Sequence, residues 1–335
     1  MPPSVLVTGG AGYVGSHACK ALAEAGHLPV TLDNLVNGHR SAVRWGPFVR
    51  GDVADEALVR RVLREHRIEA VMHFAAYCYV GESMQEPGRY FQNNVGGSVA
   101  LLNAMRAENA NCLVFSSTCA TYGIPRSVPI DEDHPQQPVN PYGESKLFVE
   151  RMLAWFGAAH GLRYAALRYF NAAGADADGE AGEDHDPETH LIPLAIDAAL
   201  GRRPPVAIFG TDYPTPDGTA IRDYIHVTDL AVAHVEALRR LQAGADDLRL
   251  NLGTGRGHSV REVIRTIGEV GGRPVPVTEA PRRPGDPPLL VAASGRAGRL
   301  LGWTPRHSDL RNIVATAWRW HSSHVARNHA AAAAD

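Results

Sequence analysis

The chain has 335 residues, more than one compact domain usually contains, so we expect two domains that share a cleft. Its 44% hydrophobic and 21% charged residues are typical of a globular protein with sizeable cores. The formal net charge of −3 excludes a global positive field, so we expect neither nucleic acid nor a membrane as a partner.

Short apolar runs alternate with longer amphipathic stretches in the first half of the chain. The apolar runs predict buried strands over residues 4–7, 29–32, 70–74, 112–115 and 164–167. The amphipathic stretches predict helices over residues 16–25, 56–65, 91–106 and 142–160. This alternation predicts an α/β fold of the Rossmann type, a doubly wound parallel sheet with helices on both faces.

The sequence changes in character after residue 171. Residues 175–189 are rich in glycine, alanine and acidic residues, which predicts an exposed loop. Later elements are short and interrupted by prolines, which predicts a smaller, loop-rich α/β domain over the carboxyl edge of the sheet, where ligands bind in open α/β folds. We expect the first domain to cover residues 1–170, with about 222–252 returning to it, and the second to cover 171–335.

A glycine triplet lies where the first predicted strand turns into the first predicted helix. Gly9, Gly12 and Gly15 form a G-x-x-G-x-x-G pattern. The first glycine permits a tight turn, the second lets the backbone approach a pyrophosphate, and the third lets the helix pack close to the strand. The helix N-terminus adds free N–H groups and a partial positive charge. The pattern predicts a dinucleotide site in the first domain.

A carboxylate at the end of the second strand indicates which dinucleotide is bound. Asp33 lies close to the ~20-residue spacing expected for a group that binds the adenosine ribose hydroxyls. Such a group repels a 2′-phosphate, so NAD is favoured over NADP. The alternative is that Asp33 caps a turn with Asn34. Asp52, after a third strand, is a candidate partner of the adenine or equally a plain turn residue.

A second constellation lies at a later helix start. Pro141 suits the first turn of a helix, and Tyr142 and Lys146 are four residues apart, so they share one face. A lysine ammonium and the charge of oxidised nicotinamide both lower the pKa of a phenol, which makes Tyr142 a candidate base. A surface Tyr–Lys pair is the alternative. Ser116 and Thr118 follow the fourth long strand and would emerge at the same sheet edge.

These residues together resemble the extended short-chain dehydrogenase/reductase family, and within it the nucleotide-sugar 4-epimerases. The glycine loop, the Ser/Thr–Tyr–Lys set and the run from Phe74 to Ala76 carry the resemblance. It covers nearly the whole chain, in segments 8–17, 73–83, 115–123, 140–146, 167–174, 189–193, 207–230, 251–255 and 282–286. Residues 208–227 are the most specific to the epimerases.

The resemblance implies epimerisation at C4 of a UDP-hexose (UDP-glucose and UDP-galactose) through a 4-keto intermediate, with a tightly bound NAD. It implies that Tyr142 is the base and acid, assisted by Thr118, and that Lys146 holds the nicotinamide ribose. The NAD site it implies consists of Gly9, Gly12, Tyr13, Val14, Gly15, Asp33, Asn34, Asp52, Val53, Phe74, Ala75, Ala76, Asn93, Ser116, Tyr142, Lys146 and Phe170. The UDP-sugar site it implies consists of Cys78, Thr118, Tyr142, Asn171, His190, Leu191, Ala207, Phe209, Arg222, Arg283, Asp286 and Leu290.

The chemistry of the implied substrate residues agrees with a nucleotide diphosphate. Arg222 and Arg283 can clamp the diphosphate with charge-assisted hydrogen bonds, and Phe209 can flank the uracil. The alternative for Arg222 is an ion pair with Asp223 or Asp229.

Several positions depart from the family pattern and leave the substrate open. Cys78 stands where some relatives have lysine, His190 stands where asparagine is common, and Leu290 stands where a tyrosine or a small residue controls access of an N-acetyl group. UDP-N-acetylhexosamines and UDP-pentoses are therefore alternative substrates. A 4,6-dehydratase is a rival activity, but its acid pair is replaced here by Cys119 and Ala120. A non-catalytic NAD-binding sensor is a further rival, although such proteins commonly lose the tyrosine or the lysine.

Oligomeric state and location complete the expectations. The resemblance implies a homodimer built on two helices per subunit, and the apolar positions of residues 91–106 and 142–160 are candidates for that surface. The four cysteines are scattered without metal-ligand spacing, so we expect no metal and a reducing compartment. The N-terminal sequence lacks the features of a signal peptide, which favours the cytoplasm.

Overall fold

The computed structural model describes residues 2–283 and 285–332, with side chains as far as residue 323. A seven-stranded sheet, in the order β10-β6-β5-β4-β1-β2-β3, forms its larger part, and all of its strand pairs are parallel. Its strands are β1 (Ser4–Thr8), β2 (Leu28–Asp33), β3 (Phe48–Arg50), β4 (Ile68–His73), β5 (Cys112–Thr118), β6 (Arg163–Tyr169) and β10 (Leu248–Leu252). The five predicted strands are all present; four are extended by one to three residues, and β4 begins two residues before the predicted start and ends before Phe74.

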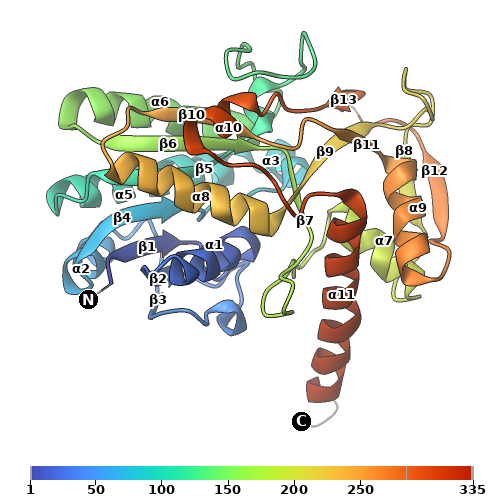
Figure 1. The fold of residues 1–335 in the computed structure, drawn as a ribbon, viewed down its shortest axis with the longest axis horizontal. Coiled ribbons are helices and arrows are strands. Elements are labelled where there is room, and N and C mark those ends of the chain that lie inside the picture. Colours follow the sequence, from blue (N-terminus) through green and yellow to red (C-terminus); the bar gives the residue numbers. More distant parts are fainter. Residues whose placement is uncertain (1, 284, 333–335) are drawn as a thin grey trace.

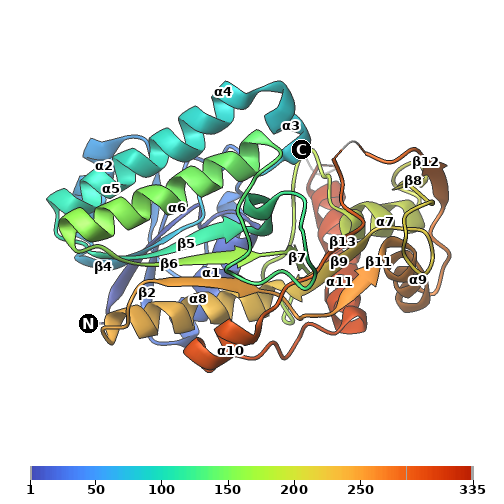
Figure 2. The same cartoon turned by 90° about the horizontal axis from the view of Figure 1, so that it is seen from above.

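Helices cover both faces of this sheet, as Figure 2 shows. One face packs against α1 (Tyr13–Glu24), α8 (Val227–Gln242) and α10 (Gly295–Leu301) around a core that includes Leu22, Leu230 and Leu238. The other packs against α2 (Glu56–Glu65), α5 (Gly97–Ala107) and α6 (Pro141–His160). The predicted Rossmann-type α/β fold is therefore confirmed.

The predicted helix over residues 91–106 has a more complicated start. It follows α3 (Val80–Gln85) and α4 (Pro87–Tyr90), and its first residues, Phe91–Gly96, are wound as a π-helix before α5 begins. Two short 3₁₀ helices, Arg40–Ala42 and Cys119–Tyr122, complete this half of the chain.

A smaller group of elements lies beyond the carboxyl ends of β4, β5 and β6 (Figure 1). One sheet has the order β11-β9-β13, with β7 also paired to β9, and β12 pairs with β8. The elements are β7 (Asn171–Ala173), α7 (Leu191–Ala199), β8 (Val206–Phe209), β9 (Ile221–His226), β11 (Gly257–Ser259), α9 (Val260–Gly271), β12 (Val277–Ala280), β13 (Leu289–Leu290) and α11 (Leu310–Ala332). Helices α7, α9 and α11 enclose a separate core with Ile196, Ile267 and Ile313.

The expectation that residues 175–189 form an exposed loop is wrong in part. Ala175, Asp176, Ala181 and Glu183 are all buried. The Lys20 ammonium, on α1, lies 2.8 Å from Asp176 and 2.9 Å from Asp178 and Glu180. The acidic residues that suggested an exposed loop therefore form ion pairs with Lys20 on α1, the first helix that packs on the large sheet.

Candidate active site

Close packing requires glycine at two of the three glycine positions in the loop between β1 and α1. Gly9 has φ of 73°, and a methyl group there would lie 2.6 Å from the backbone nitrogen of Ala75. A methyl group at Gly15 would lie 2.1 Å from the Gly9 carbonyl oxygen. Gly12 differs, because its φ is −86° and a methyl group there would meet only the same oxygen, at 3.4 Å. The fold does not need glycine at position 12, so its bare backbone is available to a ligand.

Helix α1 begins directly after this glycine without a side-chain cap. Gly12 is its N-cap, and its first turn contains no acidic residue. The N–H groups of the first turn, at Tyr13, Val14 and Gly15, have no partner within the helix. Together with the partial charge of the helix N-terminus they form an anion site suited to a pyrophosphate. The loop and helix start therefore fit the phosphates of NAD.

Asp33 ends β2 beside this loop and is buried. Its carboxylate accepts the N–H of Ala11 at 3.0 Å and the N–H of Leu35 at 2.8 Å. Burial raises its pKa, and these two hydrogen bonds oppose that rise. The contact with Leu35 is a local turn, so the capping alternative describes part of what Asp33 does. A carboxylate has about four lone-pair positions, so two hydrogen bonds leave acceptor capacity for ribose hydroxyls.

The remaining cofactor candidates surround the same sheet edge. Asn34 donates to Asp52 at 2.9 Å, and Asp52 also accepts the N–H of Ala54 at 2.8 Å, as a turn residue does. Phe74 and Ala75 donate their backbone N–H groups to Thr8 at 2.9 and 3.0 Å, and Ala76 follows them. Of the others, Val53 and Phe170 are buried, and Asn93 donates to Asn94 at 3.0 Å.

Helix α6 begins at the predicted position and presents Tyr142 in its first turn. Asn140 caps the helix by accepting the N–H of Gly143 at 2.8 Å, and Pro141 is its first residue. Burial raises the pKa of Tyr142 well above its ordinary value, and Tyr169 and Cys78 add to this rise. A hydrogen bond with Thr118 opposes it. Tyr142 and Thr118 are thus brought together as predicted, with the phenol held in its protonated form.

Lys146 lies one turn further along α6 and points to the end of β5. Its ammonium donates to the carbonyl oxygen of Ser116 at 3.0 Å and lies 5.0 Å from the centre of the Phe115 ring. Burial lowers the pKa of Lys146 to about 8. We expected Lys146 and the oxidised nicotinamide together to lower the pKa of Tyr142; in this structure burial has the largest effect on that pKa and raises it.

The hydroxyls at the end of β5 divide between the two faces of the sheet, because side chains alternate along a strand. The Ser116 hydroxyl hydrogen-bonds the hydroxyl of Tyr169 at 2.7 Å. The Ser117 hydroxyl instead donates to Glu150 at 2.5 Å, within a buried ion pair with Arg168. Tyr169 was not predicted. The strand register could have revealed it, since Tyr169 ends β6 directly beside Thr118.

On the substrate side, Arg222 pairs with Asp286, sixty-four residues away in the sequence. The alternative partners are excluded by their own contacts. Asp223 accepts hydrogen bonds from Thr254 and from the backbone of Gly255 and Ala292. Asp229 accepts hydrogen bonds from Arg306, His307 and Ser308. Two residues predicted to hold the UDP portion therefore contact each other.

The other substrate candidates come from several elements of the smaller part. The Arg283 guanidinium lies 4.0 Å from the centre of the Phe209 ring, at the end of β8. Asn171 donates to the Asp223 carbonyl at 3.1 Å, and Leu290 on β13 is aligned with Arg222 on β9. Ala207 lies in β8, Leu191 is the first residue of α7, and Cys78 is an exposed free thiol.

His190, predicted to contact the nucleotide, lies against two acids in the structure. Its Nδ1 atom lies 2.8 Å from Glu183 and 2.9 Å from Glu188. Burial alone would lower the pKa of His190, but these two carboxylates raise it well above its ordinary value. The spacing of cysteine and histidine does not predict this grouping, because two of its four members are glutamates.

Comparisons with known proteins agree with this geometry. The model of the NAD dependent epimerase/dehydratase family matches residues 5–253. A UDP-glucose 4-epimerase of Rhizobium leguminosarum bv. trifolii is 54% identical, over 95% of this chain and 97% of the relative. The crystal structure of UDP-glucose 4-epimerase from Brucella ovis in complex with NAD has a TM-score of 0.94 at 54% identity, covering 95% of this chain and 98% of that one. The Bifidobacterium longum enzyme in complex with NAD+ and UDP has a TM-score of 0.90 at 37% identity, with coverages of 96% and 99%.

Proposed function

Because the chain belongs to the NAD dependent epimerase/dehydratase family, we infer that it is an isomerase that inverts C4 of a UDP-hexose, interconverting UDP-glucose and UDP-galactose. The observation that carries this inference is the meeting of Thr118, Tyr142 and Lys146 at the carboxyl edge of the parallel sheet, beside the glycine loop. These three side chains suit the oxidation of a carbinol by NAD, and C4 of the sugar with its hydroxyl is such a carbinol.

The cofactor of this enzyme is NAD, which accepts a hydride from C4 and returns it. The chain holds it by the features described above. The bare backbone at Gly12 and the uncapped start of α1 receive the pyrophosphate, and Asp33 receives the adenosine ribose. We propose that the other NAD residues named from the sequence line the same site. Because the hydride is returned to C4, the reaction would have no net redox change and the NAD would not need to leave the protein.

Tyr142 removes the proton of the sugar C4 hydroxyl as the hydride leaves, and returns it when the hydride comes back. Its buried phenol is protonated at rest, so the positive charge of the oxidised cofactor and the nearby Lys146 must lower its pKa during turnover. Thr118 orients the phenol through their hydrogen bond. Between the two transfers the sugar is a 4-keto compound, which must turn so that the hydride reaches the opposite face.

The nucleotide must stay anchored while the sugar turns, and we assign this to the substrate residues named from the sequence. Arg222 is one of them, and its guanidinium is held in place by an ion pair with Asp286. Arg283 is another, and its guanidinium stacks on the ring of Phe209 at the end of β8. Two guanidinium groups from separate segments can clamp a diphosphate bidentately. Leu290, beside Arg222, contributes to the wall that decides which sugars fit.

The rival activities are not supported. Dehydration needs an additional acid and base after the catalytic threonine, and Cys119 and Ala120 occupy those places in the 3₁₀ helix. A sensor without activity would not need Tyr142 and Lys146 placed together at the sheet edge.

The direct test incubates the purified protein, without added NAD, with UDP-glucose, UDP-N-acetylglucosamine and UDP-xylose in separate reactions. Separation of the products by chromatography should show UDP-galactose from UDP-glucose as the fastest conversion. If only the acetylated sugar or the pentose is converted, the hexose assignment is wrong. If no sugar is converted by protein that carries NAD, the epimerase assignment itself is wrong.

We further propose that the chain divides into an NAD-binding domain, 1–170 with about 222–252, and a UDP-sugar domain, 171–335.

We also propose a homodimer that pairs helices α5 and α6 of each subunit. Trp155 on α6 is 76% exposed, and Phe148 and Val99 are exposed apolar residues on the same two helices. These helices lie side by side on one face of the molecule (Figure 2).

The four free thiols agree with a cytoplasmic enzyme. No helix in the described part of the chain is long and apolar enough to cross a membrane.

A further inference from the structure

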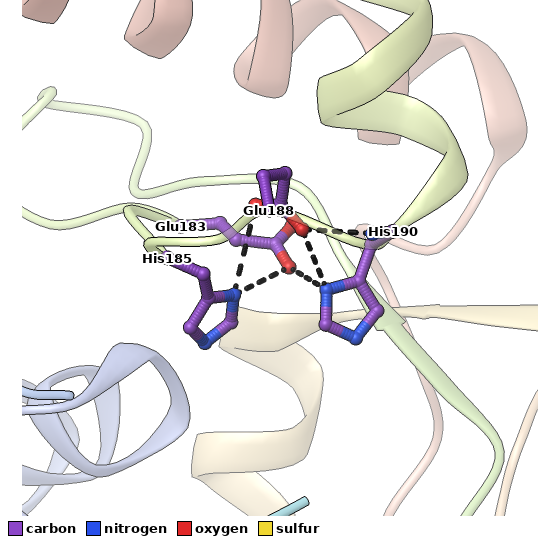
Figure 3. Close-up of side chains that lie close together, drawn as sticks. All are labelled: Glu183, His185, Glu188 and His190. Atoms are coloured by element: carbon purple, nitrogen blue, oxygen red, sulfur yellow. Dashed lines mark hydrogen bonds and ion pairs between the residues drawn. The ribbon is translucent and has the colours of Figure 1, made fainter. Parts of the chain in front are cut away.

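Four side chains of metal-ligand type converge between β7 and α7. None of them takes part in the hydride or proton transfer, although one, His190, is also among the residues named for the UDP-sugar site. They are Glu183, His185, Glu188 and His190, and Figure 3 shows both carboxylates and both imidazole Nδ1 atoms pointing into one space. Each residue offers one ligand atom, and all four atoms lie within 4.8 Å of one another. The sequence spacing is Glu-x-His-x-x-Glu-x-His, contributed by a single short segment.

The distances between the ligand atoms agree with a tetrahedral ion site. Nδ1 of His185 lies 3.2 Å from Glu183 and 3.6 Å from Glu188. Nδ1 of His190 lies 2.8 and 2.9 Å from the same two carboxylates. Tetrahedral Zn²⁺ with bonds of about 2.0–2.1 Å separates its ligand atoms by about 3.3–3.4 Å. A small outward movement of His190 would therefore be enough to admit the ion.

One atom of the cluster has no satisfactory partner. Nδ1 of His185 is buried and makes no hydrogen bond of acceptable geometry, although two carboxylates are near it. Buried polar atoms without partners are rare in native proteins and call for an unseen group. The side chains of Glu183, His185 and Glu188 are 5%, 14% and 15% exposed, whereas that of His190 is 47% exposed. The cluster is thus closed on three sides, and His190 forms its solvent side.

Among the described residues, histidines are the only charged partners of the two carboxylates in this cluster. In the described part of the chain, neither Glu183 nor Glu188 has an ion pair with a lysine or an arginine. The neighbouring acids Asp176 and Asp178 differ, because the ammonium of Lys20 occupies the space between them. The two carboxylates are paired with His185 and His190, and a divalent ion bound by the four side chains would take the place of the protons of the two imidazolium groups.

We propose that Glu183, His185, Glu188 and His190 bind a single divalent transition-metal ion of the Zn²⁺ type. Imidazole nitrogen with carboxylate oxygen suits Zn²⁺, whereas Mg²⁺ and Ca²⁺ prefer all-oxygen sites. Four protein ligands fill a tetrahedral ion, so the site is structural and leaves no position for the sugar. His190 is the residue before α7, and the His185 ring lies 6.2 Å from that of Tyr13 on α1. The ion would therefore hold residues 183–190 in one conformation, between Tyr13 of α1 and the start of α7.

The test uses the full chain with its bound cofactor, stripped of metal by a chelator and titrated with Zn²⁺ alone. Calorimetry and elemental analysis should give one Zn²⁺ per chain, and Co²⁺ in its place should give the strong visible absorption of a tetrahedral ion. His185→Gln and His190→Gln should each weaken Zn²⁺ binding by at least about tenfold, since even outer-shell changes cost that much. The melting temperature should rise with added Zn²⁺ for the wild type and not for these variants.

Asp178→Asn is the matched control, because it changes the neighbouring acidic cluster without touching the four ligands; its Zn²⁺ affinity should equal that of the wild type. His190 lies on the solvent side, so its variant remains informative if the His185 variant folds poorly by circular dichroism. The proposal is overturned if the wild type binds no stoichiometric Zn²⁺, or if both histidine variants bind it as tightly as the wild type does. Zn²⁺ binding is measured without substrate, so this outcome is independent of the epimerase assignment.

Discussion

The Lys146 ammonium lies 3.0 Å from the carbonyl oxygen of Ser116, and this hydrogen bond ties the first two turns of α6 to the end of β5. Tyr142 is one turn earlier on the same helix, and Thr118 is two residues later on the same strand. The lysine therefore sets the position of the tyrosine relative to the threonine in addition to carrying charge.

Replacing Tyr142 by phenylalanine should remove the base and leave the cofactor in place. We expect epimerisation to fall by about 10²–10⁴-fold, the usual effect of losing a general base. Bound NAD, measured after denaturation of the purified protein, should stay at the wild-type level. Tyr164→Phe is the control, since its hydroxyl pairs with Arg249 away from the site and its loss should leave the rate unchanged. A fully active Tyr142→Phe enzyme would assign the base elsewhere.

Gly12 and Gly15 should respond differently to a single methyl group. Gly12→Ala meets only a 3.4 Å contact, so the unfolding free energy should change by less than about 1 kcal/mol. NAD binding should weaken by at least tenfold, or about 1.4 kcal/mol, because we propose that the pyrophosphate lies against the backbone at position 12. Gly15→Ala places its methyl group 2.1 Å from a carbonyl oxygen and should lower the melting temperature even without NAD. Thermal unfolding and NAD titration of the apoprotein measure the two effects. Equal melting temperatures and equal NAD affinities of the two variants would contradict the proposed pyrophosphate site at Gly12.

Arg222→Gln should weaken the binding of UDP. A hydrogen bond to a charged group contributes about 1.5–3 kcal/mol, so we expect the Kd for UDP to rise by about 10–100-fold. Calorimetric titration of the NAD-loaded protein with UDP measures this directly. Arg261→Gln is a suitable control, since that arginine pairs with Glu279 at an exposed position. An unchanged Kd in Arg222→Gln would remove this residue from the diphosphate site.

Stability should fall as the pH is lowered from about 6.5 to 4. Burial lowers the pKa of His17, His226 and His234 to about 4 and that of His73 to about 3. Unfolded histidines titrate near 6.5, so in this range the unfolded chain takes up protons that the folded chain does not. The unfolding free energy then decreases with falling pH, by about 1.4 kcal/mol per pH unit for each histidine.

The pH slope can be assigned to individual residues. Urea unfolding at several pH values should show a smaller slope for His234→Gln, by the share of one histidine. His160→Gln, at an exposed position, should keep the wild-type slope. If the His234 variant keeps the full slope, this histidine takes up no proton on unfolding.

The exposed tryptophan on α6 offers a test of the dimer. Trp155→Glu with Phe148→Ser should give a monomer by light scattering, because it places charge and polarity on the apolar face of that helix. Val277→Glu, at an exposed position on β12, should leave the mass of the particle unchanged. A wild-type monomer, or a dimer in the double variant, would contradict this interface.

Local patterns predicted the first half of the fold well. The glycine spacing, the β-branched strands and the Asn-Pro start of α6 each act over a few residues, so their structural effect is legible in the sequence. Residues 175–190 were misjudged because their environment comes from distant segments. The side chain of Lys20 neutralises Asp176, and the indole of Trp320 donates to the Glu183 carbonyl at 2.8 Å. The partner of Arg222 was missed for the same reason, since only the folded chain brings Asp286 beside it.

The phenol of Tyr13 donates to the carbonyl oxygen of Gly174 at 2.6 Å, and Lys20, two turns further along α1, is paired with Asp176. Helix α1, which we propose receives the cofactor, is thus fastened to the segment that leads to α7. This has a consequence for protein engineering. A chimaera that takes residues 175–190 from another enzyme, in order to alter sugar preference, exchanges the partners of α1 at the same time. We therefore expect an exchange of this segment to change the retention of NAD as well as the preference for the sugar.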